Sequence, residues 1–200
     1  PFSCDDFFAV VRAMHNARPE RPELRRIAIC FVGVAAPGEL MVDAARTPLN
    51  VGIAISLVDF TRQEADGFLP ALAAQLPNPA DWLDSIYGWT SGHPYMTHKL
   101  CAELCKQAQS VTIPAERVEE VVRRQFLQNG RVSETNLQYA ERRIDAHASS
   151  GLLLRMYRRV LEGQSIPADR NDPLQSELWL SGICKWHQGC LVVRNRIFSV

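Results

Sequence analysis

The hydrophobic pattern of the chain changes its period near residue 60, and this change constrains the fold more than any other feature. Before it, residues 27–34 and 53–58 form two short, continuous apolar runs, the pattern of strands buried on both faces of a parallel sheet. After it, apolar residues recur at roughly every third or fourth position, as on helices that bury one face. The sequence therefore predicts an α/β segment followed by a mostly helical region.

Helical spacing predicts one helix before the first apolar run and a succession of helices after the second. Residues 4–18 begin with Asp5 and Asp6, which suit the positive end of a helix. Thr61 and Glu64 have the spacing of a capping box, so a helix is predicted from residue 61 to about 75. Further helices are predicted at residues 80–89, 95–108, 114–128, 133–147, 152–161 and 172–181, and a hairpin of short strands at 183–186 and 190–193.

Charge and composition exclude several classes of partner. Lysine plus arginine and aspartate plus glutamate number 22 each, so the formal net charge is zero. A whole-molecule attraction to nucleic acid or to an anionic membrane is therefore absent. No apolar run reaches the roughly 18 residues that a membrane-spanning helix requires, and no segment has the pattern of a signal peptide. We therefore expect a cytoplasmic protein without a membrane partner, and the start at Pro1 predicts a piece of a longer polypeptide.

The six cysteines are dispersed along the chain and are expected to remain reduced as small apolar residues. Cys184, His187 and Cys190 come nearest to a metal-binding cluster, around the turn of the predicted hairpin. Zinc sites use paired Cys or His spacings that this sequence lacks. No metal site is predicted.

Catalytic motifs are missing from the sequence: it contains no GxxxxGK[ST], GxSxG or HExxH. Asp59 ends an apolar run and could bind magnesium, but a helix begins two residues later, so capping of that helix is the favoured interpretation. A hydrolase that uses His93, His98 or a cysteine remains an alternative, although no nucleophile, base and orienting group can be named together. We therefore predict that this chain alone is not an enzyme and that it carries no catalytic residues.

Several local strings, taken together and in order, resemble the AAA-like domain of large bacterial signalling ATPases of the STAND type. The resemblance runs over nearly the whole chain, and the set of strings carries it rather than any single string. The strings are Asp6–Phe8, Val11–Ala13, Phe31–Leu40, Thr47–Gly52, Leu57–Thr61, Glu64–Ala65, Thr90–Thr97, Leu180–Ile183 and Val193–Phe198.

The resemblance implies a P-loop nucleotide-binding domain followed by a helical lid and a winged helix. Residues 1–76 would then be the C-terminal part of the P-loop domain, 77–147 the helical lid, and 148–200 the winged-helix domain. The phosphate loop and the Walker B acid would lie upstream of Pro1. The expected fold class is thus an α/β fragment of a P-loop sheet followed by mostly α structure.

The resemblance also implies a function, the C-terminal half of a nucleotide-dependent signalling switch. ATP or ADP with magnesium would be bound by the longer parent, which is expected to be an ATPase. Gly92, His93 and Pro94 resemble the glycine-x-proline turn of NB-ARC-like relatives, whose proline packs near the adenine. Arg46 is a second candidate, as a sensor of the γ-phosphate, because arginine suits a bidentate phosphate contact. Expected partners are the nucleotide and other domains of the same polypeptide, with self-association left open.

A DNA-binding transcriptional regulator with a winged helix is the alternative. Arg194 and Arg196 belong to a mild basic excess near the C-terminus and could neutralise DNA phosphates. However, the predicted recognition helix, residues 174–180, carries Glu177 and Trp179 and no basic residue. A nucleic-acid partner is therefore not expected, and a role within the switch is favoured.

Overall fold

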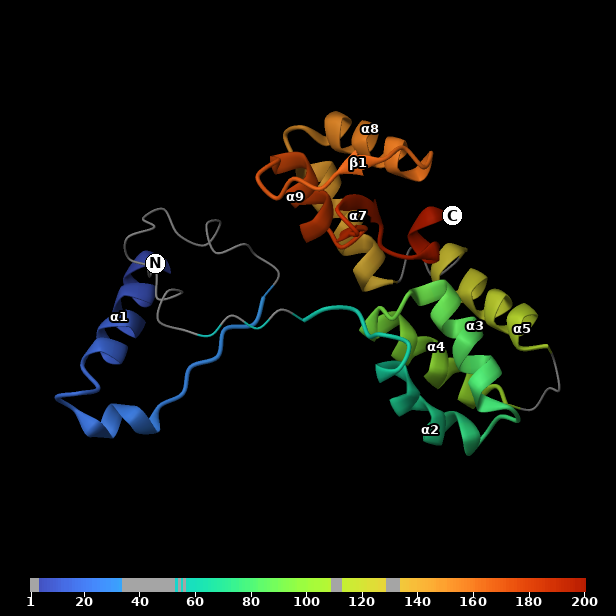
Figure 1. Cartoon of the computed structure of the whole chain (residues 1–200), viewed down its shortest axis with the longest axis horizontal. Coiled ribbons are helices and arrows are strands. Elements are labelled where there is room, and N and C mark those ends of the chain that lie inside the picture. Colours follow the sequence, from blue (N-terminus) through green and yellow to red (C-terminus); the bar gives the residue numbers. More distant parts are fainter. Residues whose placement is uncertain (1–3, 34–52, 54, 56, 109–112, 129–133) are drawn as a thin grey trace. The chain divides into compact units, whose positions relative to one another are not determined.

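The computed structural model describes residues 4–33, 53, 55, 57–108, 113–128 and 134–200. The chain divides into two compact units, residues 1–57 and residues 58–200 (Figure 1). The described residues are mostly helical, with one small antiparallel sheet of three strands. None of the helices in this part of the chain is long and apolar enough to cross a membrane.

The first unit contains helix α1 (Cys4–Asn16) and a short 3-10 helix, η1 (Pro22–Arg26). The predicted N-terminal helix is confirmed, with Asp5 and Asp6 in its first turn. The rings of Phe7 and Phe8 pack edge to face with the ring of Phe31, with centroids 6.0 and 5.3 Å away. This aromatic cluster joins α1 to the apolar segment that follows η1.

The prediction of strands at 27–34 and 53–58 is wrong. The residues of these two runs that the structure describes form no strand. Residues 27–33 carry no strand pairing, and neither do residues 53, 55, 57 and 58. Val32, Ile53 and Leu57 are 86%, 93% and 86% exposed. A strand exists through hydrogen bonds to a neighbouring strand, and no described segment provides that neighbour. Val34, Ala54 and Ser56 lie outside the described residues.

The second unit begins with a helical subdomain, residues 64–127. Its elements are η4 (Glu64–Phe68), α2 (Leu69–Ala73), α3 (Pro79–Thr90), α4 (Pro94–Lys106), α5 (Pro114–Val122) and the π-helical turn η5 (Arg123–Leu127). The capping box is confirmed: Thr61 N donates to Glu64 Oε2 at 2.8 Å, and Glu64 N donates to Thr61 Oγ1 at 3.2 Å. Prolines at the first position of α3, α4 and α5 fit because that position needs no N–H donor. These helices lie side by side around one core that contains Leu83, Met96 and Phe126 (Figure 1).

A C-terminal subdomain, residues 135–193, follows. Its elements are α7 (Thr135–Ala146), α8 (Ser150–Leu161), β1 (Ile166–Pro167), α9 (Pro173–Leu180), β2 (Cys184–His187) and β3 (Cys190–Val193). The strands are antiparallel in the order β1-β3-β2. The predicted hairpin is confirmed, and its two turn residues, Gln188 and Gly189, have φ of +48° and +77°, as a tight hairpin turn requires. Leu153, Leu178 and Leu191 belong to a second core.

Five residues after β3, which we call the docking segment (residues 194–198), contact the helical subdomain. Ile197, in the 3-10 helix η6 (Arg196–Ser199), is 3% exposed and belongs to the core of the helical subdomain. Phe198 packs against both cores. The guanidinium of Arg196 lies 3.8 Å from the ring centroid of Trp89 on α3. The C-terminal end of the chain therefore packs on residues of α3 and α4 that precede it by about 100 positions.

Candidate functional site

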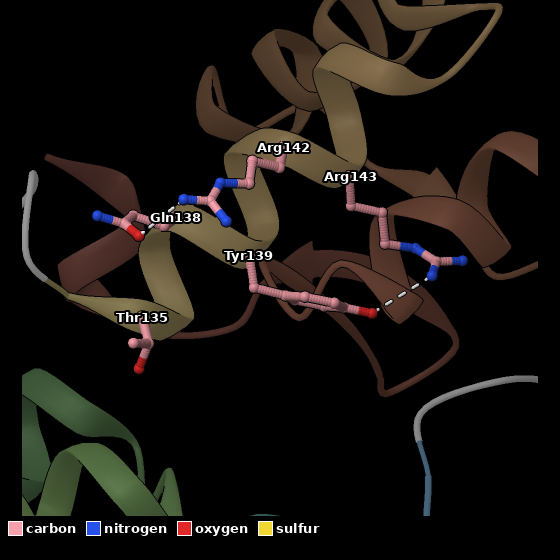
Figure 2. A pocket seen from close by; sticks show the side chains of 5 residues that line it. All are labelled: Thr135, Gln138, Tyr139, Arg142 and Arg143. Atoms are coloured by element: carbon pink, nitrogen blue, oxygen red, sulfur yellow. Dashed lines mark hydrogen bonds between the residues drawn. The ribbon is translucent and has the colours of Figure 1, made fainter.

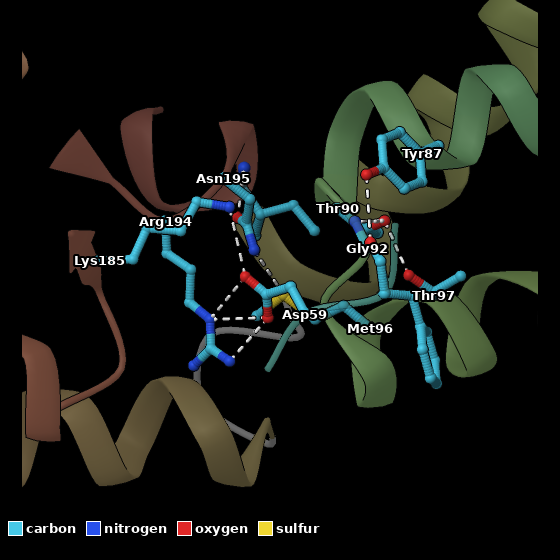
Figure 3. Close-up of polar contacts among 11 residues, drawn as sticks. Asp59, Tyr87, Thr90, Gly92, Met96, Thr97, Lys185, Arg194 and Asn195 are labelled. Atoms are coloured by element: carbon cyan, nitrogen blue, oxygen red, sulfur yellow. Dashed lines mark hydrogen bonds and ion pairs between the residues drawn. The ribbon is translucent and has the colours of Figure 1, made fainter. Parts of the chain in front are cut away.

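The turn Gly92–His93–Pro94 joins α3 to α4 and packs directly against the segment that leads into the helical subdomain (Figure 3). Gly92 has φ of +79°, and a Cβ at this position would lie 1.9 Å from the carbonyl oxygen of Phe60. Phe60 N donates a hydrogen bond to Gly92 O at 2.8 Å. Only glycine combines a left-handed backbone with so close an approach of a second chain segment.

His93 is the most unusual residue of the turn, because its side chain is 9% exposed and its Nδ1 has no hydrogen-bond partner among the described residues. Burial, and then the charge of Arg194, lower the pKa of His93 to about 4. The imidazole is therefore neutral at neutral pH. A buried ring nitrogen without a partner is costly, and this marks the turn as a candidate site.

The side chains beneath the turn make it rigid. Thr90 and Thr97 are both fully buried, and their hydroxyl oxygens lie 2.8 Å apart in a hydrogen bond. The hydroxyl of Tyr87 donates to the carbonyl oxygen of Phe60 at 3.1 Å. Pro94 fixes the backbone at the first position of α4. Buried contacts therefore hold the turn in one conformation, with Gly92 and His93 covered and Pro94 partly exposed.

A cluster of charged side chains lies beside the turn (Figure 3). The Asp59 carboxylate accepts hydrogen bonds from Arg194 Nη2 at 2.8 Å, from Arg194 Nε at 3.1 Å and from Lys185 Nζ at 3.3 Å. Burial by itself would raise the pKa of Asp59, but the hydrogen bonds and charges of Arg194 and Lys185 together outweigh it and hold the pKa below its ordinary value. The predicted capping role of Asp59 is wrong, because Thr61 makes the capping contacts and Asp59 binds the C-terminal subdomain instead.

Sequence analysis missed Asn195, which is 5% exposed. Its Oδ1 accepts hydrogen bonds from the N–H groups of Ile197 and Phe198, at 3.1 and 3.4 Å. Its Nδ2 lies 3.4 Å from the sulfur of Met96 on α4. An asparagine after a strand and before a short helix is a capping signal, and this signal was available in the sequence.

The remaining sequence candidates do not gather into a site. Arg46 lies outside the described residues. His98 is exposed on α4, while burial raises the pKa of the Cys101 thiol to about 12, so this thiol is not a nucleophile at neutral pH. Among the described residues, no three His, Cys, Asp or Glu side chains could hold a metal ion together, and this includes Cys184, His187 and Cys190. The hydrolase alternative gains no support.

A shallow hollow of about 360 Å³ lies along α7 and is lined by polar and aromatic side chains (Figure 2). These side chains already bind protein groups: Arg142 donates to Gln138 at 3.2 Å, and Arg143 donates to the Tyr139 hydroxyl at 3.3 Å. Arg143 also forms an ion pair with Glu177 on α9, with 2.6 Å between the nearest atoms. All five lining residues belong to α7, and the cationic ones are engaged by Gln138, Tyr139 and Glu177, so we do not take the hollow as the functional site.

The same contacts weigh against DNA binding by α9. Glu177 is held by Arg143, and Trp179 stacks on Trp186 with ring centroids 5.1 Å apart. Arg194 and Arg196, the basic residues that could have met phosphates, contact Asp59 and Trp89. The helix and the arginines therefore have intramolecular roles, and the DNA-binding alternative is not favoured.

The buried state of His93 predicts a pH dependence of stability. An unfolded histidine takes up a proton near pH 6.5, whereas the folded one does so only near pH 4. The free energy of unfolding therefore falls as the pH decreases from about 6.5 to about 4, by up to about 3 kcal/mol. Urea titrations at pH 7 and pH 5 should show a loss of about 2 kcal/mol, and His93→Gln should lose clearly less. Equal losses in both proteins would contradict this burial.

Comparison with known proteins gives two matches. Residues 1–193 match a family described as an AAA-like domain. An uncharacterized WD repeat-containing protein of Synechocystis sp. is 32% identical over 209 residues, an alignment that covers 100% of this chain and 17% of that relative. The chain thus spans only a small part of the length of this relative. No solved structure matches.

Proposed function

Because the chain belongs to the AAA-like domain family, we propose that it is part of a nucleotide-dependent signalling switch of the STAND type. It contributes the lid and the C-terminal domain that respond to ATP or ADP. Its sequence contains no GxxxxGK[ST], so the phosphates and magnesium are held by another part of the same polypeptide. The complete polypeptide acts as an ATPase, and this chain acts as the responding part.

The partnerless, buried Nδ1 of His93 is the observation that carries this proposal. It lies in a turn that Gly92 and Pro94 make rigid, next to the apolar ring of Pro94. A purine base offers both a flat apolar face for the proline and polar edge atoms for the imidazole. Pro94, which is partly exposed, would therefore hold the face of the base, and the imidazole of His93 would meet its edge in the state of the switch in which the turn is uncovered. Hydrolysis of the γ-phosphate would supply the free energy that separates the two states of the switch.

The proposed domain organisation keeps the boundaries that the family resemblance implies, although Ala65, Leu72 and Leu76 share the core of the helical subdomain. Residues 1–76 are the end of the nucleotide-binding domain, 77–147 the helical lid and 148–200 a winged helix. Within residues 148–200, helix α8, strand β1, helix α9 and the β2–β3 hairpin, with strand order β1-β3-β2, fit the outline of a winged helix, and α7 packs on the same core. Arg46 remains the proposed sensor of the γ-phosphate.

The proposed partners are the nucleotide, other domains of the same polypeptide and a second copy of the protein. The WD repeats named in the Synechocystis relative are the kind of domain that such a switch could control. We place the protein in the cytoplasm. The free thiols of Cys30, Cys101, Cys105, Cys184 and Cys190 agree with a reducing compartment.

Calorimetric titration of the complete polypeptide encoded by the gene with ATP and ADP tests the proposal. Replacing His93 and Pro94 together by alanine should weaken nucleotide binding at least about tenfold, which corresponds to about 1.4 kcal/mol. Pro79→Ala is the matched control, because Pro79 opens α3 in the same way that Pro94 opens α4. Unchanged affinity in the double variant would refute docking on the turn. Salt-dependent binding to duplex DNA would revive the alternative.

A further inference from the structure

Three parts of the second unit meet at Asp59 and Phe60. The backbone of Phe60 contacts the Gly92 turn through the hydrogen bond to Gly92 O. The side chain of the preceding residue, Asp59, is held by Arg194 of the docking segment, 135 positions later in the chain. The turn and the C-terminal subdomain are therefore linked through two consecutive residues.

The other contacts of the docking segment share this arrangement. Asn195 lies against Met96 at the start of α4, Arg196 lies over Trp89 at the end of α3, and Ile197 belongs to the core to which both helices contribute. Trp89 and Met96 flank the Gly92–His93–Pro94 turn on its two sides. The docking segment thus contacts the two helices that the turn joins, at the ends that lie next to the turn.

We infer that Arg194 is a positioning residue that couples the Gly92–His93–Pro94 turn to the docking of the C-terminal subdomain. The ion pair with Asp59 is made when the segment before the helical subdomain lies on the turn, and it is broken when that segment moves. This coupling is a way in which the proposed switch is regulated. Its regulatory role rests on the proposed function. The coupling itself rests only on the contacts among Asp59, Phe60, Gly92 and Arg194.

The geometry favours two states of the Asp59–Arg194 ion pair, formed and broken, over a gradual lengthening of the contact. Hydrogen bonds weaken steeply once donor and acceptor separate beyond about 3.5 Å or lose alignment. The Asp59 and Arg194 side chains are 12% and 24% exposed, so their separation leaves Arg194 partly buried without its charge partner and Asp59 with only the 3.3 Å contact to Lys185. Such a state is unfavourable unless the docking segment also moves to let water reach both groups. Movement of Phe60 and release of residues 194–198 should therefore occur together.

Amide hydrogen exchange of the 200-residue chain, followed by NMR, tests the coupling. In Asp59→Asn and in Arg194→Gln, the amides of Phe60, Ile197 and Phe198 should exchange about tenfold faster or more, because their acceptors lie in the released contacts. The amides of Val121 and Val122, in the buried middle of the helical subdomain, should change by less than about twofold. Asp84→Asn is the matched control, since its ion pair with Arg62 is exposed, and it should leave all five amides unchanged.

Two results would overturn the inference. Unchanged exchange at Phe60, Ile197 and Phe198 in both variants would show that the ion pair does not hold the docking segment. Faster exchange of Val121 and Val122 by the same factor would show that the ion pair stabilises the whole second unit. It would then not couple one part of the unit to another. The double variant should match Asp59→Asn, because that change already removes the charge with which Arg194 and Lys185 pair. Failure of nucleotide binding in the calorimetric test would leave this coupling intact and remove only its proposed purpose.

Discussion

Replacing Gly92 by alanine is expected to lower the free energy of unfolding by about 3–5 kcal/mol. The backbone at Gly92 has φ of +79°, a conformation that costs an L-residue about 1–2 kcal/mol by itself. The new Cβ would also lie 1.9 Å from the carbonyl oxygen of Phe60. Because that oxygen is backbone, no side-chain rotation can relieve the overlap, and the segment at residues 59–60 must leave the turn.

Gly88→Ala provides the matched control. Gly88 lies inside α3, and a Cβ there would meet no atom within 4 Å. Alanine in a helix interior is favoured over glycine by about 0.5–1 kcal/mol, so this variant should be more stable than the parent. Urea unfolding followed by far-UV circular dichroism measures both changes. A cost below about 1 kcal/mol for Gly92→Ala would show that Phe60 does not lie against the turn.

Replacing Lys99 by methionine should cost about 3 kcal/mol or more. Its ammonium group contacts the carboxylate of Glu134, whose side chain is 1% exposed, and lies 5.1 Å from the ring centroid of Phe126. Glu134 also accepts a hydrogen bond from the Tyr95 hydroxyl at 3.2 Å. Methionine keeps most of the volume of the lysine stem but leaves a buried carboxylate without its charge partner.

Lys106→Met, on the same helix, is the control for Lys99→Met. Lys106 pairs with Glu103 at 2.9 Å but is 71% exposed, and exposed ion pairs contribute only about 0–1 kcal/mol. Changing Glu134 to glutamine in the Lys99→Met background should recover part of the loss, because it removes the unpaired charge. Equal costs for the two lysine variants would contradict the burial of Glu134.

Local patterns predicted most helices of the second unit, but the helix predicted at 61–75 is the 3-10 helix η4 followed by the short α2, and the one predicted at 114–128 ends in the π-helical turn η5. The spacing of apolar residues and the Thr61–Glu64 capping box act over a few residues, so they are visible in sequence. The hairpin was predicted for the same reason. The strand β1 was missed, because two residues that include Pro167 carry no periodic signal.

Sequence reasoning failed where the structure depends on distant partners. The apolar runs at 27–33 and 57–58 read as strands, but a strand also needs a neighbour, and apolar character alone does not provide one. Asp59 read as a helix cap because its local context suits one, whereas its partner lies 135 positions away. No local pattern encodes such a pair.

The candidate site was partly accessible to sequence reasoning. Glycine followed by histidine and proline is a turn with a helix start, and this much follows from turn chemistry. The approach of Phe60 to Gly92 and the burial of His93 beside Arg194 do not follow from it. Both features arise only when the segment before the helical subdomain and the docking segment fold onto the turn.

Amide hydrogen exchange of the complete polypeptide, measured by mass spectrometry with and without saturating ATP, tests the central claim most directly. A nucleotide that docks on the Gly92–His93–Pro94 turn should slow exchange at residues 92–97 and change it at residues 194–198, where the docking segment reports on the C-terminal subdomain. Exchange in β2 and β3 should stay as it was. ATP binding that leaves both regions unchanged would contradict the account, because the nucleotide would then act through another part of the protein.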